Sequence, residues 1–353
     1  MPPPDTAQPR APVLRGVFDR FVSGDDALLQ LAGLRFAEAG MQAEPYADTP
    51  EQLEQRLRFV PPRPALPTAH LSRFINLLRD DGQRQVQAFT RQFEGRLRGV
   101  VVHDQAGMAD RIPEVVTAMR NATAGRSPDT PLVFLEYAAG MDPERFTELA
   151  RQLGDVGGAS VCVDIGHVGI RESRRRLEAA HPRLDLTTLS RDGGAAPGLV
   201  SDVQTAARSA VDVVLQMIES IGRVGKPVHY HLHDGHPLIP GLSDHFSFLT
   251  RLPVPFTWEG RSSLDPMYGL GGLNQVLTAI VEHGPPGGSS ATLEIHQSEG
   301  RLPLANAAGL FGHWTDLTNA ERMNYRLSVL TGNHLIASTM LDEIHARPGF
   351  GPA

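Results

Sequence analysis

The sequence predicts an α/β protein in which eight parallel strands alternate with helices and close into a (β/α)8 barrel of the TIM-barrel type, followed by a C-terminal helical extension. Two observations lead to this prediction. Short apolar runs alternate along the chain with longer segments of helical period, which is typical of repeated β-α units. The chain has 353 residues, 41% of them hydrophobic, which is enough to bury the core of one barrel.

The expected strands are short apolar runs bounded by turn-forming residues. They span residues 13–18, 41–46, 67–71, 97–103, 131–136, 159–164, 227–233 and 292–296. The sixth run contains the single cysteine, Cys162, which cannot form an internal disulfide and is expected to pack in the core. These runs predict a flexible tail over residues 1–12, a barrel over 13–300 and the helical extension over 301–353.

Helical segments with recognisable ends separate the strands. Residues 25–40 begin with two aspartates, carry apolar residues at spacings of three and four, and stop at glycine. Thr-Pro opens residues 49–60 and Asp-Pro opens residues 142–158, as expected at helix starts. These segments are expected in an outer ring of helices, and a further helix is expected over residues 317–344 of the extension.

Two connections are too long for a plain barrel. They span residues 168–205 and 246–268, and we expect them to be long loops that act as lids over the strand ends.

Charge and hydropathy limit the partners. The net charge is −7 and the isoelectric point is near 6.0, so nucleic acid is disfavoured as a partner, although a local basic patch leaves it open. Four arginines lie within residues 171–176, and they form either a phosphate-binding patch or a solvated helix face. No apolar run approaches the ~20 residues of a membrane span. We therefore expect a cytoplasmic protein without a membrane partner; a homo-oligomer is compatible with the sequence.

Side chains that can bind metal stand where successive expected strands end. From the third strand to the eighth they are His70, His103, Glu136, Asp164, His231 and Glu294. A barrel brings these ends together at one rim. Buried carboxylates are costly without a partner, and a divalent cation neutralises them while binding neutral imidazole nitrogen. The sequence therefore predicts a shared divalent-metal site, although any one of these residues alone could be a satisfied polar residue.

The stretch PVHYHLHDGHP in the seventh strand is rich in histidine. The two-residue period of a strand puts His229, His231 and His233 on one face, so they are not all expected to be ligands. We expect His231 to bind the metal and Asp234 to support a ligand or contact substrate, with His229 and His236 as ordinary polar positions.

The order of VFLEYAAG, VCVDIGH, HLHD and LEIH resembles the xylose isomerase-like barrels, a superfamily with sugar isomerases, sugar epimerases and the endonuclease IV group (AP endonuclease family 2). The likeness covers the expected barrel. It implies a divalent ion (Mn, Mg, Co or Zn) held by Glu136, Asp164, His231 and Glu294. It also implies that His167 contacts substrate or a further metal.

The segments HLSRFINL, VVVH and SDHF resemble the endonuclease IV group in particular. This narrower resemblance implies a three-metal site with additional ligands, namely His70, His103, His167, Asp244 and His245. The sequence departs from that group at two points. Asp244 and His245 are adjacent where the group has Asp-x-His, and Arg73 stands where the group has an aromatic residue that intercalates into DNA.

Two chemistries follow from the resemblance. The first expectation is an isomerase or epimerase of a sugar, sugar phosphate or polyol, in which Glu136 and Glu294 exchange a proton across the substrate and His167 binds a substrate oxygen. The alternative is an endonuclease IV-like, zinc-dependent phosphodiester hydrolase acting on abasic DNA. The alternative requires the histidines at positions 70, 103 and 245 to be ligands. A non-enzymatic metal-binding scaffold is a third reading.

Overall fold

The computed structural model describes residues 12–18, 25–138, 141–183, 197–237, 245–249, 252–258, 261–264, 266–285, 288–295 and 319–347. Its strands are β1 (Val13–Val17), β2 (Gln42–Glu44), β3 (Tyr46–Ala47), β4 (Thr68–Leu71), β5 (Gly99–His103), β6 (Leu132–Glu136), β7 (Ala159–Asp164), β8 (Val228–Leu232), β9 (Leu252–Trp258), β10 (Arg261–Leu264) and β11 (Ser289–Leu293).

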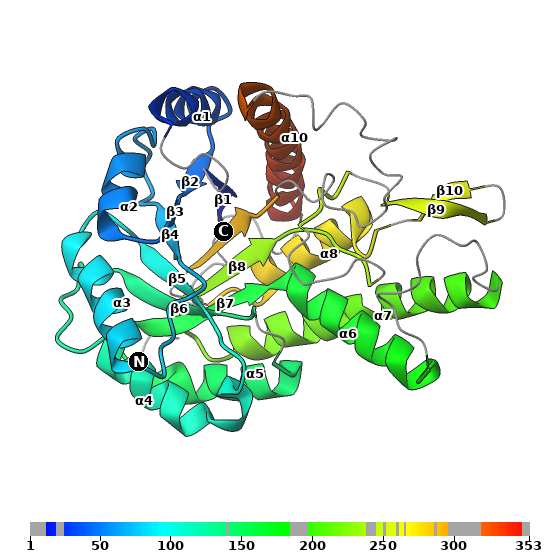
Figure 1. The fold of residues 1–353 in the computed structure, drawn as a ribbon, viewed down its shortest axis with the longest axis horizontal. Coiled ribbons are helices and arrows are strands. Elements are labelled where there is room, and N and C mark those ends of the chain that lie inside the picture. The colour runs from blue at the N-terminus through cyan, green and yellow to red at the C-terminus, as the bar shows by residue number, and fades with distance from the viewer. Residues whose placement is uncertain are drawn as a thin grey trace.

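A parallel, nearly closed barrel forms the centre of the molecule (Figure 1). Within the described residues the sheet has nine strands in the spatial order β2-β1-β11-β8-β7-β6-β5-β4-β3. The strands at its two ends, β2 and β3, are separated in the chain by Pro45 alone. Proline has no N–H to give to a ladder, which accounts for the break. The sheet therefore returns almost to its starting point.

Most strands lie where the sequence predicts them. Six of the eight expected strands agree with the structure to within two residues at each end: β1, β4, β5, β6, β7 and β8. The second expected strand is divided at Pro45 into β2 and β3. The last strand, β11, begins at Ser289, three residues earlier than expected. It ends at Leu293, so Glu294 follows the strand.

Helices surround the barrel. They are α1 (Asp26–Glu38), α2 (Pro50–Leu57), α3 (Asp80–Gln92), α4 (Ile112–Ala122), α5 (Pro143–Gln152), α6 (Ile165–Ala180), α7 (Pro197–Gly222), α8 (Gly269–Glu282) and α10 (Asn319–His345). The predicted end signals are present at two of them, since the Asp25 side chain accepts from the N–H groups of Ala27 and Leu28, and Thr49 accepts from Gln52 N–H. Apolar faces of these helices pack on the strands in one large core.

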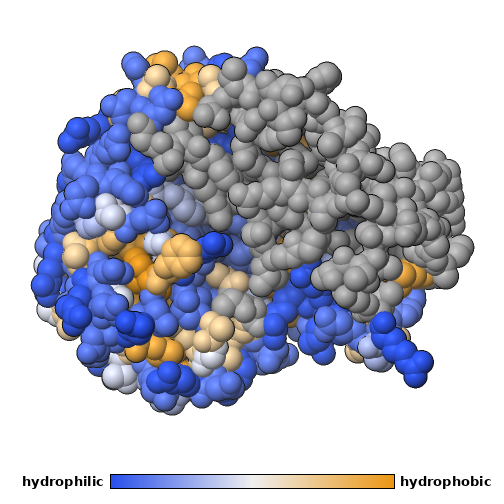
Figure 2. Space-filling view, viewed as in Figure 1, coloured by the Kyte–Doolittle hydropathy of each residue, from blue (hydrophilic) through white to orange (hydrophobic). Residues whose placement is uncertain are grey.

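Cys162 is fully buried beside Val101 and Phe134, as expected for a core residue. Figure 2 shows one face of the molecule, whose described part is mainly hydrophilic with small separate hydrophobic areas. Among the described residues, no helix combines the length and the apolar character that crossing a membrane requires. The predicted tail lies almost entirely outside the described residues.

The structure contradicts the prediction of two long loops at residues 168–205 and 246–268, because both connections contain regular secondary structure. Helix α6 begins directly after β7, because the Asp164 side chain accepts from His167 N–H at 2.8 Å and caps the helix. Helices α6 and α7 together occupy much of 168–205; residues 184–196 lie outside the described residues. The second connection contains the antiparallel pair β9 and β10, whose valine, phenylalanine and tryptophan favour strands.

Helix α10 follows the last barrel strand in the chain and packs in the layer around the barrel. It contacts α1, α8, β1 and β11, and it runs between α1 and α8 in Figure 1. A Cβ added at Gly16 of β1 would lie 3.0 Å from Leu330 of α10, so the helix approaches the strand closely. Buried Arg326 also donates to the carbonyl oxygen of Phe18 at 3.0 Å. Its apolar face is therefore covered by the barrel itself.

Candidate metal centre

Among the described residues, five overlapping groups of buried or half-buried side chains could hold a metal ion, and in each group the donor atoms lie within 4.8 Å of one another. Three of these groups lie at the carboxyl ends of the strands and are called sets here, and a fourth group, which consists of His70, His231 and Glu294, links two of them. The central set consists of Glu136, Asp164, His231 and Glu294. The His70 set consists of His70, His103 and Glu136. The His167 set consists of Asp164, His167, His233 and His245. Glu136 and Asp164 each belong to two sets.

The structure thus brings together the predicted site residues that it describes. Asp244 lies outside the described residues. His233, which sequence reasoning did not choose, joins the His167 set. Strand β8 ends at Leu232, so the chain leaves the strand before His233 and the two-residue alternation no longer applies to it. His231 and His233 can therefore serve different sets.

Three donor atoms face one another in the His70 set. His70 Nδ1 donates to the Leu71 carbonyl oxygen at 2.9 Å, which leaves Nε2 directed into the set. That Nε2 is 2.9 Å from Glu136 Oε2 and 3.2 Å from His103 Nε2. His103 Nε2 is in turn 3.2 Å from Glu136 Oε2. Ligand atoms around one tetrahedral zinc ion at about 2.0 Å stand about 3.3 Å apart, so these atoms fit a shared cation.

The carboxylate of Glu136 is ionised in this setting. Its burial would raise the pKa, but the imidazoles of His103, His231 and His70 hold it well below its usual value. Glu136 is therefore available as an anionic ligand.

His231 is placed between carboxylates in the central set. Its Nδ1 is 3.2 Å from Glu136 Oε1 and 3.1 Å from Glu294 Oε2. Its Nε2 is 2.9 Å from Oε1 of Glu44. Burial would lower the pKa of His231, whereas its surroundings, Cys162 and the carboxylates of Glu136 and Glu44, raise it well above its usual value. A proton or a metal ion on Nδ1 would relieve the same repulsion between the carboxylates.

Glu44, at the end of β2, is the residue that sequence reasoning missed. It is fully buried and lies next to His229 and His231, 2.9 Å from each. A signal was present, because an acidic residue inside an apolar strand is costly to bury without partners. His229 is polar as expected and lies in the barrel interior, where burial lowers its pKa to about 4.

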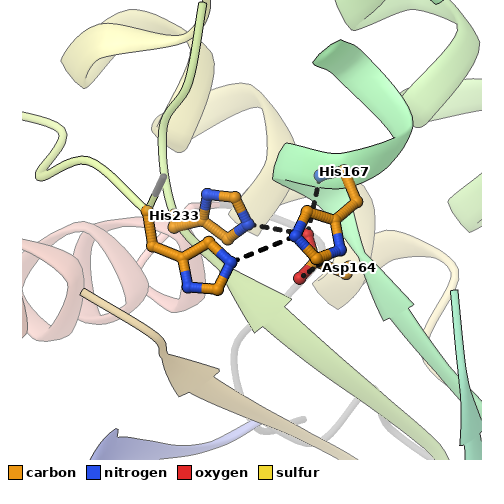
Figure 3. Close-up of side chains that lie close together, drawn as sticks. Asp164, His167 and His233 are labelled. Carbon is orange, nitrogen blue, oxygen red and sulfur yellow. Dashed lines mark hydrogen bonds and ion pairs between the residues drawn. The ribbon is translucent and has the colours of Figure 1, made fainter. Parts of the chain in front are cut away.

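Figure 3 shows Asp164, His167 and His233 of the His167 set directed toward one another. His233 Nδ1 donates to the Asp234 carbonyl oxygen at 2.8 Å, and its Nε2 lies 2.9 Å from Asp164 Oδ1. His167 Nε2 is 3.1 Å from His245 Nε2. Among the described residues, buried Asp164 Oδ2 makes no hydrogen bond, and His167 Nδ1 lies 3.4 Å from it. Imidazole nitrogens gathered around a buried carboxylate again fit a cation.

In the motif Asp-Ile-Gly-His, the glycine is required because the His233 ring leaves no space for a side chain. A Cβ added at Gly166 would lie 1.9 Å from His233 Cε1, so a larger residue would displace that ring. Burial would raise the pKa of Asp164, but His167 and His233 lower it. The aspartate is therefore ionised between the two imidazoles.

Asp234 holds the local backbone and does not face the three sets. Its carboxylate accepts from the N–H groups of Gly235, Tyr268 and Gly269 at 2.6–3.0 Å, and so fixes the start of α8. Burial raises its pKa to about 6. His236 is also buried, and burial lowers its pKa to about 3.

The arginine-rich segment is a salt-bridged helix face. Each of its guanidinium groups has a protein acceptor within 3.1 Å: Arg171 binds Asp142, Arg174 binds the Pro237 carbonyl oxygen, and Arg175 and Arg176 bind Glu172. These contacts favour the solvated-face interpretation over a phosphate-binding patch.

A cavity of about 250 Å³ adjoins the His70 set and is lined in part by Tyr46, Arg56, His70, Arg73, Phe74 and His103. Phe74 is 79% exposed, and the Arg73 guanidinium lies 5.0 Å from its ring centroid. An exposed aromatic ring therefore follows Arg73 by one position at the edge of the cavity. Tyr46 stacks on His70 at 4.1 Å, and its hydroxyl contacts Glu294.

No protein-family model and no curated protein matches the chain. One similar solved structure is the carboxyl transferase domain of Rhizobium etli pyruvate carboxylase with pyruvate and biocytin, with 12% sequence identity and a TM-score of 0.38. The match covers 97% of this chain and 50% of that one, so the chain spans about half the length of that structure. Function is therefore inferred from the side chains of the site.

Proposed function

We propose that the protein is a divalent-metal-dependent phosphodiester hydrolase with a cluster of metal ions at the three sets. The supporting observation is that the sets share carboxylates: Glu136 belongs to the central and His70 sets, and Asp164 to the central and His167 sets. Neighbouring metal ions bridged by carboxylates are used by phosphatases and nucleases. We further propose that β2 and β3 count as one interrupted strand of an eight-stranded, xylose isomerase-like barrel.

The donor atoms suit zinc best. Imidazole nitrogen and carboxylate oxygen are typical zinc ligands, and manganese or cobalt accept similar sets. The closely spaced atoms of His70, His103 and Glu136 support a cation there, because two imidazole nitrogens and one carboxylate oxygen lie within 3.2 Å of one another. In the His167 set, Asp164 Oδ2 supports the same conclusion, as this buried oxygen makes no hydrogen bond to a described residue and its nearest imidazole nitrogen, His167 Nδ1, is 3.4 Å away.

Ions at such a site supply hydroxide from water at neutral pH and stabilise the leaving oxygen. The chain's own contribution is to hold the ligands and to receive the substrate. The cavity beside His103, whose side chain is 18% exposed, gives a route to the His70 set. Arg73 and Arg56 in its wall provide positive charge for a phosphate ester. The cavity volume and the net charge of −7 favour a small phosphodiester over duplex DNA.

A sugar isomerase or epimerase is the second candidate. The central set contains the paired glutamates that this chemistry needs, and both approach His231 Nδ1 within 3.2 Å. An isomerase would, however, leave the His70 and His167 sets without a role. We therefore rank it below the hydrolase, in the reverse of the order suggested by the sequence.

Metal content and a substrate panel test the proposal. Protein reconstituted with zinc or manganese is expected to bind one ion for each of the three sets and to cleave bis(p-nitrophenyl) phosphate. His70→Ala should lose an ion and most of the hydrolysis, whereas His181→Ala, which alters a histidine paired with Asp202, should change neither. One ion per chain, no hydrolysis and aldose–ketose interconversion would establish the isomerase. Nicking of an abasic duplex would extend the substrates to DNA.

Arg73→Ala is expected to raise the KM for a phosphodiester about tenfold, because one charge-assisted hydrogen bond contributes about 1.5 kcal/mol. Its kcat should change by less than about twofold, since Arg73 does not belong to the metal-binding sets. Steady-state kinetics check this, with Arg79→Ala as control: Arg79 is 69% exposed, pairs with Asp81 and is not part of the cavity wall. An unchanged KM would mean that substrate enters elsewhere.

A further inference from the structure

We infer that Glu44 is a positioning residue for the metal centre: it holds His231 with a proton on Nε2 and thereby directs Nδ1 toward the central set. The inference rests on the metal centre of the proposed function, but it does not depend on which reaction the centre catalyses.

Glu44 receives hydrogen bonds from four side chains. His231 Nε2 lies 2.9 Å from Oε1, and His229 Nε2 lies 2.9 Å from Oε2. Thr292 donates to Oε2 at 2.9 Å, and the Thr68 hydroxyl also contacts that oxygen. An ionised carboxylate only accepts hydrogen bonds, so both imidazoles carry a proton on Nε2.

The consequence for His231 is a defined ligand atom. With Nε2–H engaged by Glu44, the lone pair of the metal-bound ring is on Nδ1, which faces Glu136 Oε1 at 3.2 Å and Glu294 Oε2 at 3.1 Å. A carboxylate behind a metal-binding histidine fixes the ring's tautomer and orientation and strengthens the ligand. Glu44 has this relation to His231 without touching the central set's other members in any described contact.

The contacts of His229 indicate that the hydrogen-bond network around Glu44 supports the metal centre and is not a further metal-binding set. Cys162, His229 and His231 have donor atoms within 4.8 Å of one another. His229 Nε2–H is directed at Glu44, and its Nδ1 accepts from the Ser290 hydroxyl at 2.7 Å. Both of its nitrogens are thus engaged. The hydrogen bonds around Glu44 therefore hold His231 from the barrel interior, whereas the metal-binding side chains lie at the rim.

Metal titration of the full-length apoprotein tests the inference. Variants Glu44→Ala, Glu44→Gln and Ser290→Ala are titrated with Co²⁺, followed by its visible absorption, and with Zn²⁺. Glu44→Ala is expected to weaken binding of one ion by about 10–100-fold, the effect of removing a residue behind a ligand. In Glu44→Gln the amide oxygen can still accept from His231 Nε2–H, so most of this loss should be restored.

Ser290→Ala is the matched control, because it removes a buried hydrogen bond to His229 and leaves the Glu44–His231 contact intact. It should destabilise the apoprotein to urea yet leave every metal affinity within about threefold. Equal loss of affinity in Ser290→Ala and Glu44→Ala would assign Glu44 a structural role only and overturn the inference. Because no substrate is used, absence of hydrolysis would refute the proposed function and leave this result intact.

A measurement on the unmodified chain covers the case in which Glu44 variants do not fold. Histidine-selective ¹⁵N NMR of the zinc-loaded protein should show His231 protonated on Nε2 and bound to zinc through Nδ1, with assignment by comparison with His231→Gln. Zinc on Nε2 of His231 would contradict the inference.

Discussion

Replacing Glu136 with glutamine is expected to lower kcat for phosphodiester hydrolysis by about 10³-fold, the scale on which loss of a preorganised charge acts in an active site. Glu136 gives Oε2 to the His70 set and approaches His231 with Oε1. A neutral amide offers one weaker ligand oxygen where the carboxylate offers two. The metal content should therefore fall together with the activity.

Metal analysis and kinetics on the same preparation check this expectation. Glu148→Gln is the matched control, since Glu148 is 40% exposed on α5 and forms a surface pair with Arg151. The control should retain its metal and its activity, because surface pairs contribute little. A Glu136→Gln protein with full metal content and full kcat would remove Glu136 from the site.

Stripping the protein of metal is expected to lower its melting temperature by about 10 °C. An ion that binds only the folded state stabilises it by about 4 kcal/mol when its concentration is 1,000 times its dissociation constant. For a chain of this size about 1 kcal/mol corresponds to 2–4 °C. Without cations the negative charges of buried Glu136, Asp164 and Glu294 are opposed mainly by the neighbouring histidines.

Calorimetry with and without dipicolinate measures the effect, and the chelator saturated with zinc controls for its direct action. Added zinc should restore the original melting temperature. Identical melting curves for stripped and reloaded protein would mean that the described sets bind no ion of structural importance.

The sequence predicts the residues at the rim well because a parallel barrel brings the carboxyl ends of successive strands together. The third to eighth apolar runs each carry a polar side chain at or beside their end. The strand ends with His70, His103, Glu136 and Asp164 meet once the strands are in register, as His103 and Glu136 show. This inference needs no knowledge of the loops between the strands.

The sequence does not reveal contacts between residues that are far apart in the chain. Glu44 and His231 are 187 positions apart in the chain, and nothing local in the second strand indicates the partner. His233 was excluded by assuming that the strand continues, whereas β8 ends one residue before it. The connection after β7 was misjudged for a related reason: Asp164 caps α6 while also facing the histidines, and a sequence pattern does not reveal that double use.

The break at Pro45 has a consequence for how the site can change over evolution. Glu44 and Tyr46 flank it, and the two side chains reach the centre at different depths, Glu44 at His231 in the interior and Tyr46 at His70 and Glu294 near the mouth. Inserting or deleting one residue between them would turn one of the two side chains away from the barrel interior. This strand contributes no member to the three sets, yet a change in its length would disturb the centre through the contacts of Glu44 and Tyr46.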